Sequence, residues 1–154
     1  MNIKIEEKLS HTMVKRIMVC LDGSKNSLRG LDKAISFAKE SGALIVGVHS
    51  DTTFSAFSAV RTPILPTKKW KQEAKKLMNI AQKKVEKNKI EFEGIVIGGH
   101  TSGIDLTTFA NNPGNRIDQI VIGSRGMGFP KELFFGSTSN FVLHKAKAPV
   151  TVVK

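Results

Sequence analysis

The sequence predicts a single α/β domain in which a parallel sheet is covered by helices on both faces. Short apolar runs that end in turn residues alternate along the chain with longer segments whose apolar residues fall at helical spacing. The alternation continues without a break in composition and without an internal repeat. The chain of 154 residues is also long enough to bury one sizeable core. This pattern favours a doubly wound sheet, because right-handed crossovers place the connecting helices against its faces.

Each expected strand is an apolar run of the buried type that ends in glycine or a polar residue. In chain order, we expect strands at 16–22, 43–50, 91–99, 116–123 and 148–154. Each expected helix carries apolar residues three or four positions apart. We expect helices at 23–42, 68–89, 102–112 and 137–147.

Several residues mark where these elements begin and end. Ser24 is a suitable N-cap for the first helix, and Gly42 is a suitable C-terminal stop. The segment 51–67 contains Pro63 and Pro66 and is expected to form a loop.

The remaining composition describes the class of protein. Residues 1–14 have no apolar core of the secretory type, and we expect them to form a mobile leader in front of a domain at 15–154. No run of eighteen apolar residues is present that would span a membrane. A single cysteine, Cys20, excludes an intramolecular disulfide and suits a reducing cytoplasm, which is the location we expect.

The net charge of +11 comes largely from the segment 68–89, where nine lysines accompany only two glutamates. Helical spacing gathers Ala74, Leu77, Met78, Ala81 and Val85 on one face and leaves the lysines on the other. We interpret the lysines as a solvated helix surface. Contact with a polyanion is the alternative, but no nucleic-acid-binding motif accompanies it, and we do not expect nucleic-acid binding.

The segment 120–140 reads IVIGSRGMGFPKELFFGSTSN and is unusually rich in glycine. It follows the fourth expected strand, and ligands of such sheets bind at the carboxyl ends of the strands. We expect Gly123, Gly126 and Gly128 to adopt positive φ and to bring main-chain amides close to an anion. The alternative is that these glycines only shape a long turn.

Ser137 and Thr138 then open the last expected helix, whose first amides carry partial positive charge. A polyphosphate fits this combination better than a neutral ligand does. The segment is neither of two commoner phosphate-binding motifs: no GK[ST] occurs in the chain, and the glycines run GxxGxG after the fourth strand instead of GxGxxG after the first.

Few other residues suggest chemistry. Asp22 ends the first strand, where it could accept a hydrogen bond from a nucleoside or cap the first helix. Arg125 could contact a phosphate or face solvent. His49 and His100 follow apolar strands, but no spaced carboxylate or nucleophile partner is visible in the sequence. Cys20 lies within an expected buried strand, where a thiol is usually inert. We therefore expect no catalytic residues and no metal-ligand cluster in the protein.

The spacing Gly123-x2-Gly126-x9-Gly136-Ser137 resembles the nucleotide-binding signature of the universal stress protein family. The ending GSTSNFVLHKAKAPVTVV and the opening RIMVCLDGSKNSLRGLDKAISFA are similar to the same family, and the resemblance covers 15–154. It implies a Rossmann-like fold of the adenine nucleotide alpha hydrolase-like type, with a five-stranded parallel sheet of order 3-2-1-4-5.

The resemblance also implies that the protein binds ATP, with Mg²⁺ or Mn²⁺ on the phosphates. Leu21 and Asp22 would lie beside the adenosine, and the backbone of Ser50 would contact the adenine edge. The residues implied for ribose and phosphates are Gly123, Gly126, Gly136, Ser137 and Thr138, with Arg125 as a further candidate. Pro130, within the spacer, departs from the pattern by removing one amide donor.

We therefore predict a nucleotide-dependent regulatory module of the stress response. Slow ATP hydrolysis or phosphoryl transfer is one alternative, although no dedicated base is visible. The other is an interaction module in which the nucleotide is incidental. The resemblance implies a homodimer joined through the last strand, 149–153, which would be an apolar sheet edge.

Overall fold

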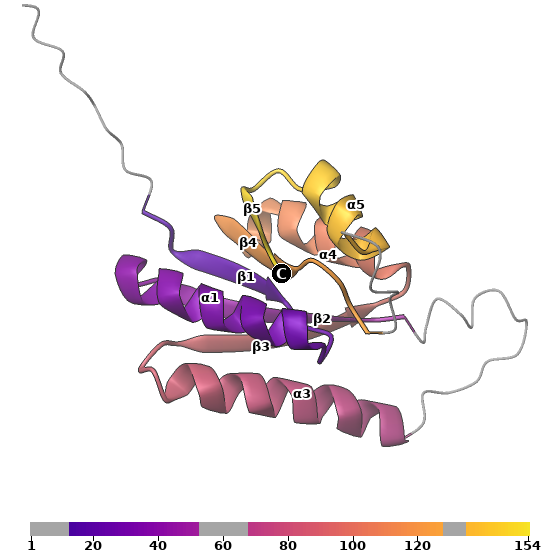
Figure 1. The fold of residues 1–154 in the computed structure, drawn as a ribbon, viewed down its shortest axis with the longest axis horizontal. Helices are drawn as coiled ribbons and strands as arrows, with labels where there is room; N and C mark the ends of the chain where they lie inside the picture. Colours follow the sequence, from indigo (N-terminus) through magenta and orange to yellow (C-terminus); the bar gives the residue numbers. More distant parts are fainter. Residues whose placement is uncertain (1–12, 53–67, 128–134) are drawn as a thin grey trace, which may run out of the picture.

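A computed structural model describes residues 13–52, 68–127 and 135–154 of the chain (Figure 1). Most of the expected leader and loop, together with Gly128 and Pro130, lie outside these residues. The strands are β1 (Arg16–Cys20), β2 (Leu44–Asp51), β3 (Phe92–Gly98), β4 (Gln119–Gly123) and β5 (Val150–Val153). The helices are α1 (Lys25–Ser41), α3 (Lys68–Glu86), α4 (Ser102–Asn111) and α5 (Ser137–Lys145), with a short 3₁₀ turn, η1 (Pro113–Asn115).

The five strands form one parallel sheet in the order β3-β2-β1-β4-β5, which confirms the predicted fold. The chain winds outward from β1 through β2 to β3, and then returns to β4 on the other side of β1. Strands β1 and β4 are therefore neighbours at the point where the winding reverses, and their carboxyl ends lie side by side.

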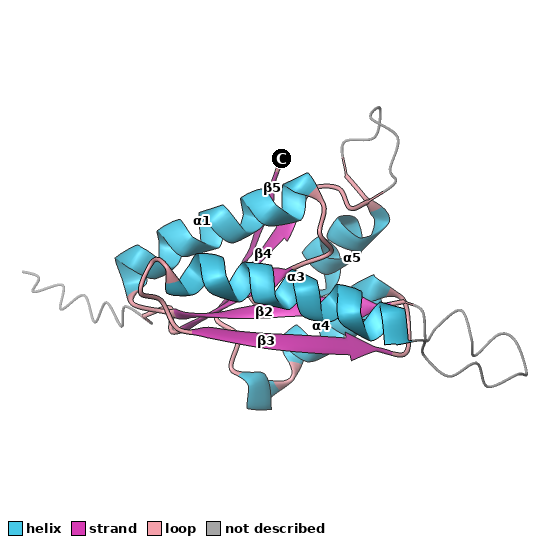
Figure 2. Cartoon of the chain, turned by 90° about the horizontal axis from the view of Figure 1, so that it is seen from below, coloured by secondary structure: helices cyan, strands magenta, loops and turns pink. Residues whose placement is uncertain are grey.

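Helices cover both faces of this sheet. The face under α1 and α3, toward which Figure 2 looks, buries Ile17, Val19, Leu31, Ile45, Ala81 and Val85 among others. The opposite face, under α4 and α5, buries Met18, Val46, Val48, Leu106, Ile120 and Val142 among others. Consecutive strand residues thus alternate between two apolar layers, which explains why the strands read as continuous apolar runs.

The ends of α1 are formed by the residues that the sequence indicates. The side chain of Ser24 accepts a hydrogen bond from the main-chain N–H of Ser27 at 3.1 Å, as an N-cap does. Gly42 ends the helix with φ of 72°, a conformation that favours glycine. Both predictions are confirmed, and each end of α1 is fixed by a capping residue.

Strand β4 begins three residues later than expected. The turn η1 and the positive φ of Arg116 (50°) redirect the chain before Gln119. Asp118, which the sequence placed within the strand, instead accepts hydrogen bonds from the main-chain N–H groups of Lys15 (2.8 Å) and Arg16 (3.0 Å). The carboxylate thereby joins the beginnings of β1 and β4, a long-range contact that no local pattern indicates.

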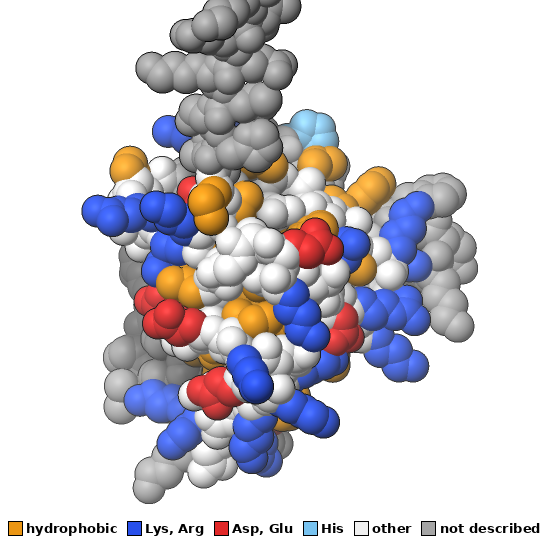
Figure 3. Space-filling model, turned by 90° about the vertical axis from the view of Figure 1, so that its left-hand side faces the viewer, with side chains coloured by type: hydrophobic (Ala, Val, Ile, Leu, Met, Phe, Trp, Pro, Cys, Tyr) orange, Lys and Arg blue, Asp and Glu red, His pale blue; other side chains and the backbone are white. Residues whose placement is uncertain are grey.

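The lysine-rich helix α3 presents its charged face to solvent. Ala74, Met78, Ala81 and Val85 are buried, whereas Lys75, Lys76 and Lys83 between them are exposed and Lys84 is partly buried. One of these lysines, Lys84, forms an ion pair with Asp32 of α1 at 2.6 Å. On the end of the molecule seen in Figure 3, basic side chains are interspersed with acidic ones. None of the helices in the described part of the chain is long and apolar enough to cross a membrane.

Candidate functional site

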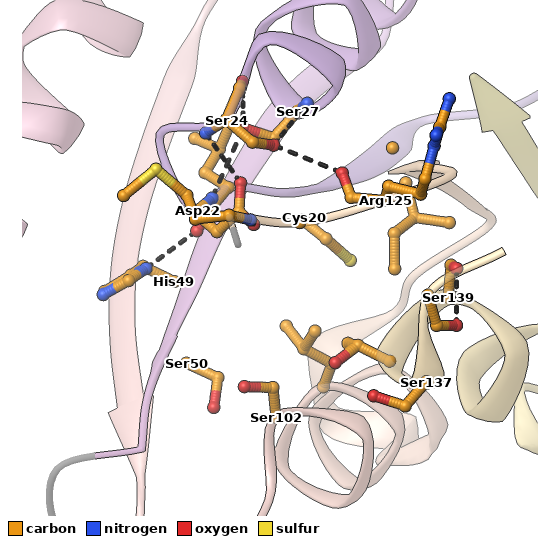
Figure 4. Close-up of a pocket in the computed structure, with 18 of the residues that line it drawn as sticks. Cys20, Asp22, Ser24, Ser27, His49, Ser50, Ser102, Arg125, Ser137 and Ser139 are labelled. Atoms are coloured by element: carbon orange, nitrogen blue, oxygen red, sulfur yellow. Dashed lines mark hydrogen bonds between the residues drawn. The ribbon is translucent and has the colours of Figure 1, made fainter. Parts of the chain in front are cut away.

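A pocket of about 320 Å³ lies at the carboxyl ends of β1, β2 and β4, where the winding of the sheet reverses (Figure 4). Every binding residue predicted from the sequence lines it: Leu21, Asp22, Ser50, Gly123, Arg125, Gly126, Gly136, Ser137 and Thr138. The lining also includes residues that the sequence did not assign to binding: Cys20, Ser24, Ser27, His49, Thr52, Ser102, Leu106, Ile122, Met127 and Ser139. Most of these occupy a strand end or the first turn of a helix, which is the signal that could have found them.

Asp22 connects the end of β1 to the glycine segment. Its Oδ1 accepts the main-chain N–H of Ser24 at 2.9 Å, and its Oδ2 accepts that of Met127 at 3.3 Å. Ser24 rather than Asp22 is therefore the N-cap of α1. The hydroxyl of Ser24 also donates to the main-chain oxygen of Arg125 at 3.4 Å. These contacts hold the first turn of α1 against the wall of the pocket.

The glycines of the segment serve close approach, and the prediction of positive φ at Gly123 and Gly126 is wrong. Among the described residues, neither of the two has positive φ. A Cβ on Gly123 would lie 2.7 Å from the main-chain carbon of Asn26, and one on Gly126 would lie 2.6 Å from Oδ2 of Asp22. Each glycine therefore makes room for another part of the protein.

Some of the main-chain amides in the segment are already used by the protein. The N–H of Gly136 donates to the oxygen of Ser124 at 2.7 Å, and that of Met127 donates to Asp22. The first amides of α5 differ, because Gly136 gives this helix no side-chain cap. Within the described part of the chain, no acceptor bonds to the N–H groups of Ser137 and Thr138.

The side chain of Arg125 extends away from Asp22 and Ser137 in Figure 4, and its main-chain oxygen accepts the hydroxyl of Ser24. His49 directs Nδ1 at the main-chain oxygen of Leu21, 2.8 Å away. Since a carbonyl oxygen only accepts, this nitrogen carries the proton. The ring thereby supports the pocket wall.

His100 has a carboxylate partner that the sequence reading missed. Its Nδ1 lies 3.2 Å from Oδ1 of Asp105, which also accepts the hydroxyl of Ser50 through Oδ2 at 3.0 Å. The partner is five residues away, in the first turn of α4, and only the change from strand to helix brings it back toward His100. Among the described residues, no group of three or more His, Cys, Asp or Glu could hold a metal ion.

Cys20 lies at the floor of the pocket with only 6% of its surface exposed. Burial, and to a smaller extent the negative charge of Asp22, raises the pKa of its thiol from 9.0 to about 12. The thiol is therefore protonated at neutral pH. This agrees with the buried, unreactive cysteine that the sequence predicts.

Comparison with known proteins agrees with this architecture. Residues 13–154 match the universal stress protein family. The chain is 31% identical to universal stress protein YxiE of Bacillus subtilis, over 92% of this chain and the whole of that protein.

Two solved structures share the fold. The universal stress protein of Archaeoglobus fulgidus in complex with dAMP is 26% identical, with a TM-score of 0.70 over 92% of this chain and 99% of that one. UspA of Lactobacillus plantarum has a TM-score of 0.74 at 21% identity, over 92% and 98% of the two chains.

We predict that Cys20 resists thiol reagents in the native protein. At pH 8 its labelling by a disulfide reagent should be at least about a hundredfold slower than in protein unfolded by urea, because the buried thiol carries no thiolate. The raised pKa also means that the free energy of unfolding should fall as the pH rises from 9 toward about 12, where the unfolded thiol ionises first. Equal labelling rates with and without urea would contradict the buried position.

The two glycines at the ends of the segment should respond differently to alanine. Gly123→Ala should lower the free energy of unfolding by about 1–3 kcal/mol, because the added methyl meets the backbone of α1. Gly136→Ala is the matched control: its nearest neighbours are 3.6 Å from the added Cβ, and its stability should stay within about 0.5 kcal/mol of wild type. Urea unfolding measures both, and equal losses would refute the close-approach role of Gly123.

Proposed function

Because the chain belongs to the universal stress protein family, we propose that it binds ATP in the pocket at the carboxyl edge of its sheet. We further propose that nucleotide occupancy serves a regulatory role in the stress response. The observation that carries this proposal is the start of α5: Ser137 and Thr138 line the pocket, and among the described residues nothing accepts a hydrogen bond from their main-chain N–H groups.

The chemistry of this helix start suits phosphate. The first amides of a helix carry partial positive charge and donate hydrogen bonds in a common direction, which favours an anion. The hydroxyls of Ser137 and Thr138 add two further donors beside them. A cation such as Mg²⁺ or Mn²⁺ would arrive on the phosphates themselves, because the described residues include no cluster that could hold a metal ion.

The other end of the pocket suits a nucleoside. Leu21 and Leu106 offer apolar surface, and Asp22 and Ser50 offer hydrogen-bonding groups. The relative from Archaeoglobus fulgidus, solved with dAMP, supports an adenine nucleotide as the ligand class. A volume of about 320 Å³ is at the lower end of the range for ligand pockets.

A second function rests on the outer edge of the sheet. Within the residues that the structure describes, strand β5 pairs with β4 alone, and all four of its residues are partly exposed, three of them valines. An apolar edge strand of this kind is a template for pairing with another chain. We propose that two copies of the chain pair through β5.

Equilibrium titration tests the nucleotide site. We predict that affinity falls in the order ATP, ADP, AMP, because each lost phosphate removes contacts to the start of α5. We also predict that a single-turnover assay recovers the bound ATP without hydrolysis. No binding, or equal affinity for the three nucleotides, would overturn the proposal.

A variant pair isolates the main-chain contribution. Ser137→Pro removes one N–H but should keep the helix, since proline is favoured at its first position and Gly136 is already extended. We expect it to weaken ATP binding about tenfold or more. Ser137→Ala, which keeps the N–H, should lose less.

The dimer can be tested by substituting a residue of β5 whose main-chain N–H points away from β4. The main-chain oxygens of Pro149 and Val153 accept hydrogen bonds from Ile120 of β4 and from Ser124, the residue after β4. Since the direction of the main-chain groups alternates along a strand, Val152 directs its N–H away from β4. Val152→Pro should convert a micromolar dimer into a monomer in sedimentation velocity, and Val152→Ala should remain dimeric. A monomeric wild type, or a dimeric Val152→Pro variant, would exclude pairing through β5.

A further inference from the structure

A buried carboxylate lies behind the wall of the pocket at Ser50. The side chain of Asp105 is 5% exposed and does not line the pocket itself, whereas Ser50 does. The hydroxyl of Ser50 lies 3.0 Å from Oδ2 of Asp105. Because a carboxylate only accepts hydrogen bonds, the serine proton points at Asp105 and away from the pocket.

The groups around Asp105 keep its carboxylate in place as the acceptor of the Ser50 hydroxyl. His100 lies 3.2 Å from Oδ1 through its ring nitrogen, and its main-chain N–H donates to Oδ2 at 3.4 Å. Both of these contacts, like that of Ser50, supply donors to the carboxylate. The fold therefore fixes the direction of the serine hydroxyl from outside the pocket.

Ser50 also occupies the end of the pocket that a base would reach. The alternation of β2 turns Val46, Val48 and Ser50 toward α4, so the hydroxyl faces the start of that helix. In Figure 4, Ser50 lies to the left and Ser137, where we place the phosphates, lies to the right, with Ser102 between them. A nucleotide spanning the pocket would present its base to Ser50.

We propose that Asp105 fixes Ser50 as a hydrogen-bond acceptor and thereby makes this pocket select purines with a 6-amino group over purines with a 6-oxo group. This inference rests on the proposed nucleotide site. A hydroxyl whose proton is committed to Asp105 offers only lone pairs to the ligand. The amino group of adenine can donate to them, whereas the oxygen of hypoxanthine or guanine would face another acceptor and leave it unsatisfied.

Titration with ATP and ITP tests the selection, because these nucleotides differ only at position 6 and the adjacent N1 proton. The wild type should bind ATP about ten- to a hundredfold more tightly than ITP. Ser50→Ala should reduce this ratio to within about threefold, because the acceptor is gone. Ser102→Ala, the same substitution at a neighbouring pocket residue without a bond to Asp105, should keep the wild-type ratio.

Asp105→Asn tests the polarity itself. An amide can donate to the oxygen of Ser50 and so release the hydroxyl proton toward the ligand. The variant should bind ITP more tightly than the wild type does, which a merely structural role of Asp105 would not produce. Should this variant fail to fold, the Ser50→Ala ratio decides the question alone.

The two proposals fail in different ways. If the wild type binds neither ATP nor ITP, both the nucleotide site and the selection are wrong. If it binds both with equal affinity, only the selection by Ser50 is wrong. A Ser50→Ala variant that keeps the full preference for ATP would also overturn the inference, and would assign discrimination to the main chain.

Discussion

The first turn of α1 rests directly on the carboxyl end of β4, and the rest of the site depends on this contact. It is possible only because residue 123 has no side chain, since a Cβ there would lie within 3 Å of the α1 backbone. Ser27, itself buried, accepts the N–H of Asp22, and Asn26 donates to the hydroxyl of Ser124. The reversal of the sheet would by itself leave a gap outside the paired carboxyl ends of β1 and β4. The seating of α1 turns that gap into a pocket with fixed walls.

This packing also divides the backbone amides between the protein and a ligand. Amides from the glycine segment that satisfy Asp22 and Ser124 shape the loop, while those of Ser137 and Thr138, beside the pocket, have no acceptor in the described part of the chain. A signature of several glycines therefore combines two physical roles. Glycine at 123 and 126 allows close packing, and the anion would be received by the helix start that follows.

The sequence was sufficient for the features that local patterns encode. The alternation of elements, the caps at Ser24 and Gly42 and the surface position of the α3 lysines follow from spacing and residue type alone. The strand order came from resemblance to a family. What could not be predicted depends on residues that meet only after folding, such as Gly126 beside Asp22 or Ser50 beside Asp105. A glycine that makes room for a distant side chain looks the same in sequence as one that needs positive φ.

A regulatory module needs a physical connection between its ligand site and the surface that a partner contacts. Here the connection is short. Ser124 donates its N–H to the main-chain oxygen of Val153 in β5, and its own oxygen accepts the N–H of Gly136 at the start of α5, each at 2.7 Å. The buried hydroxyl of Ser139 bonds to that same oxygen at 2.8 Å. One residue thus joins the helix start that would hold phosphates to the edge strand that would meet a second copy. These short hydrogen bonds fix the position of Ser124 relative to both α5 and β5. A shift of α5 on ligand binding would therefore have to change the conformation of Ser124 or move β5 as well.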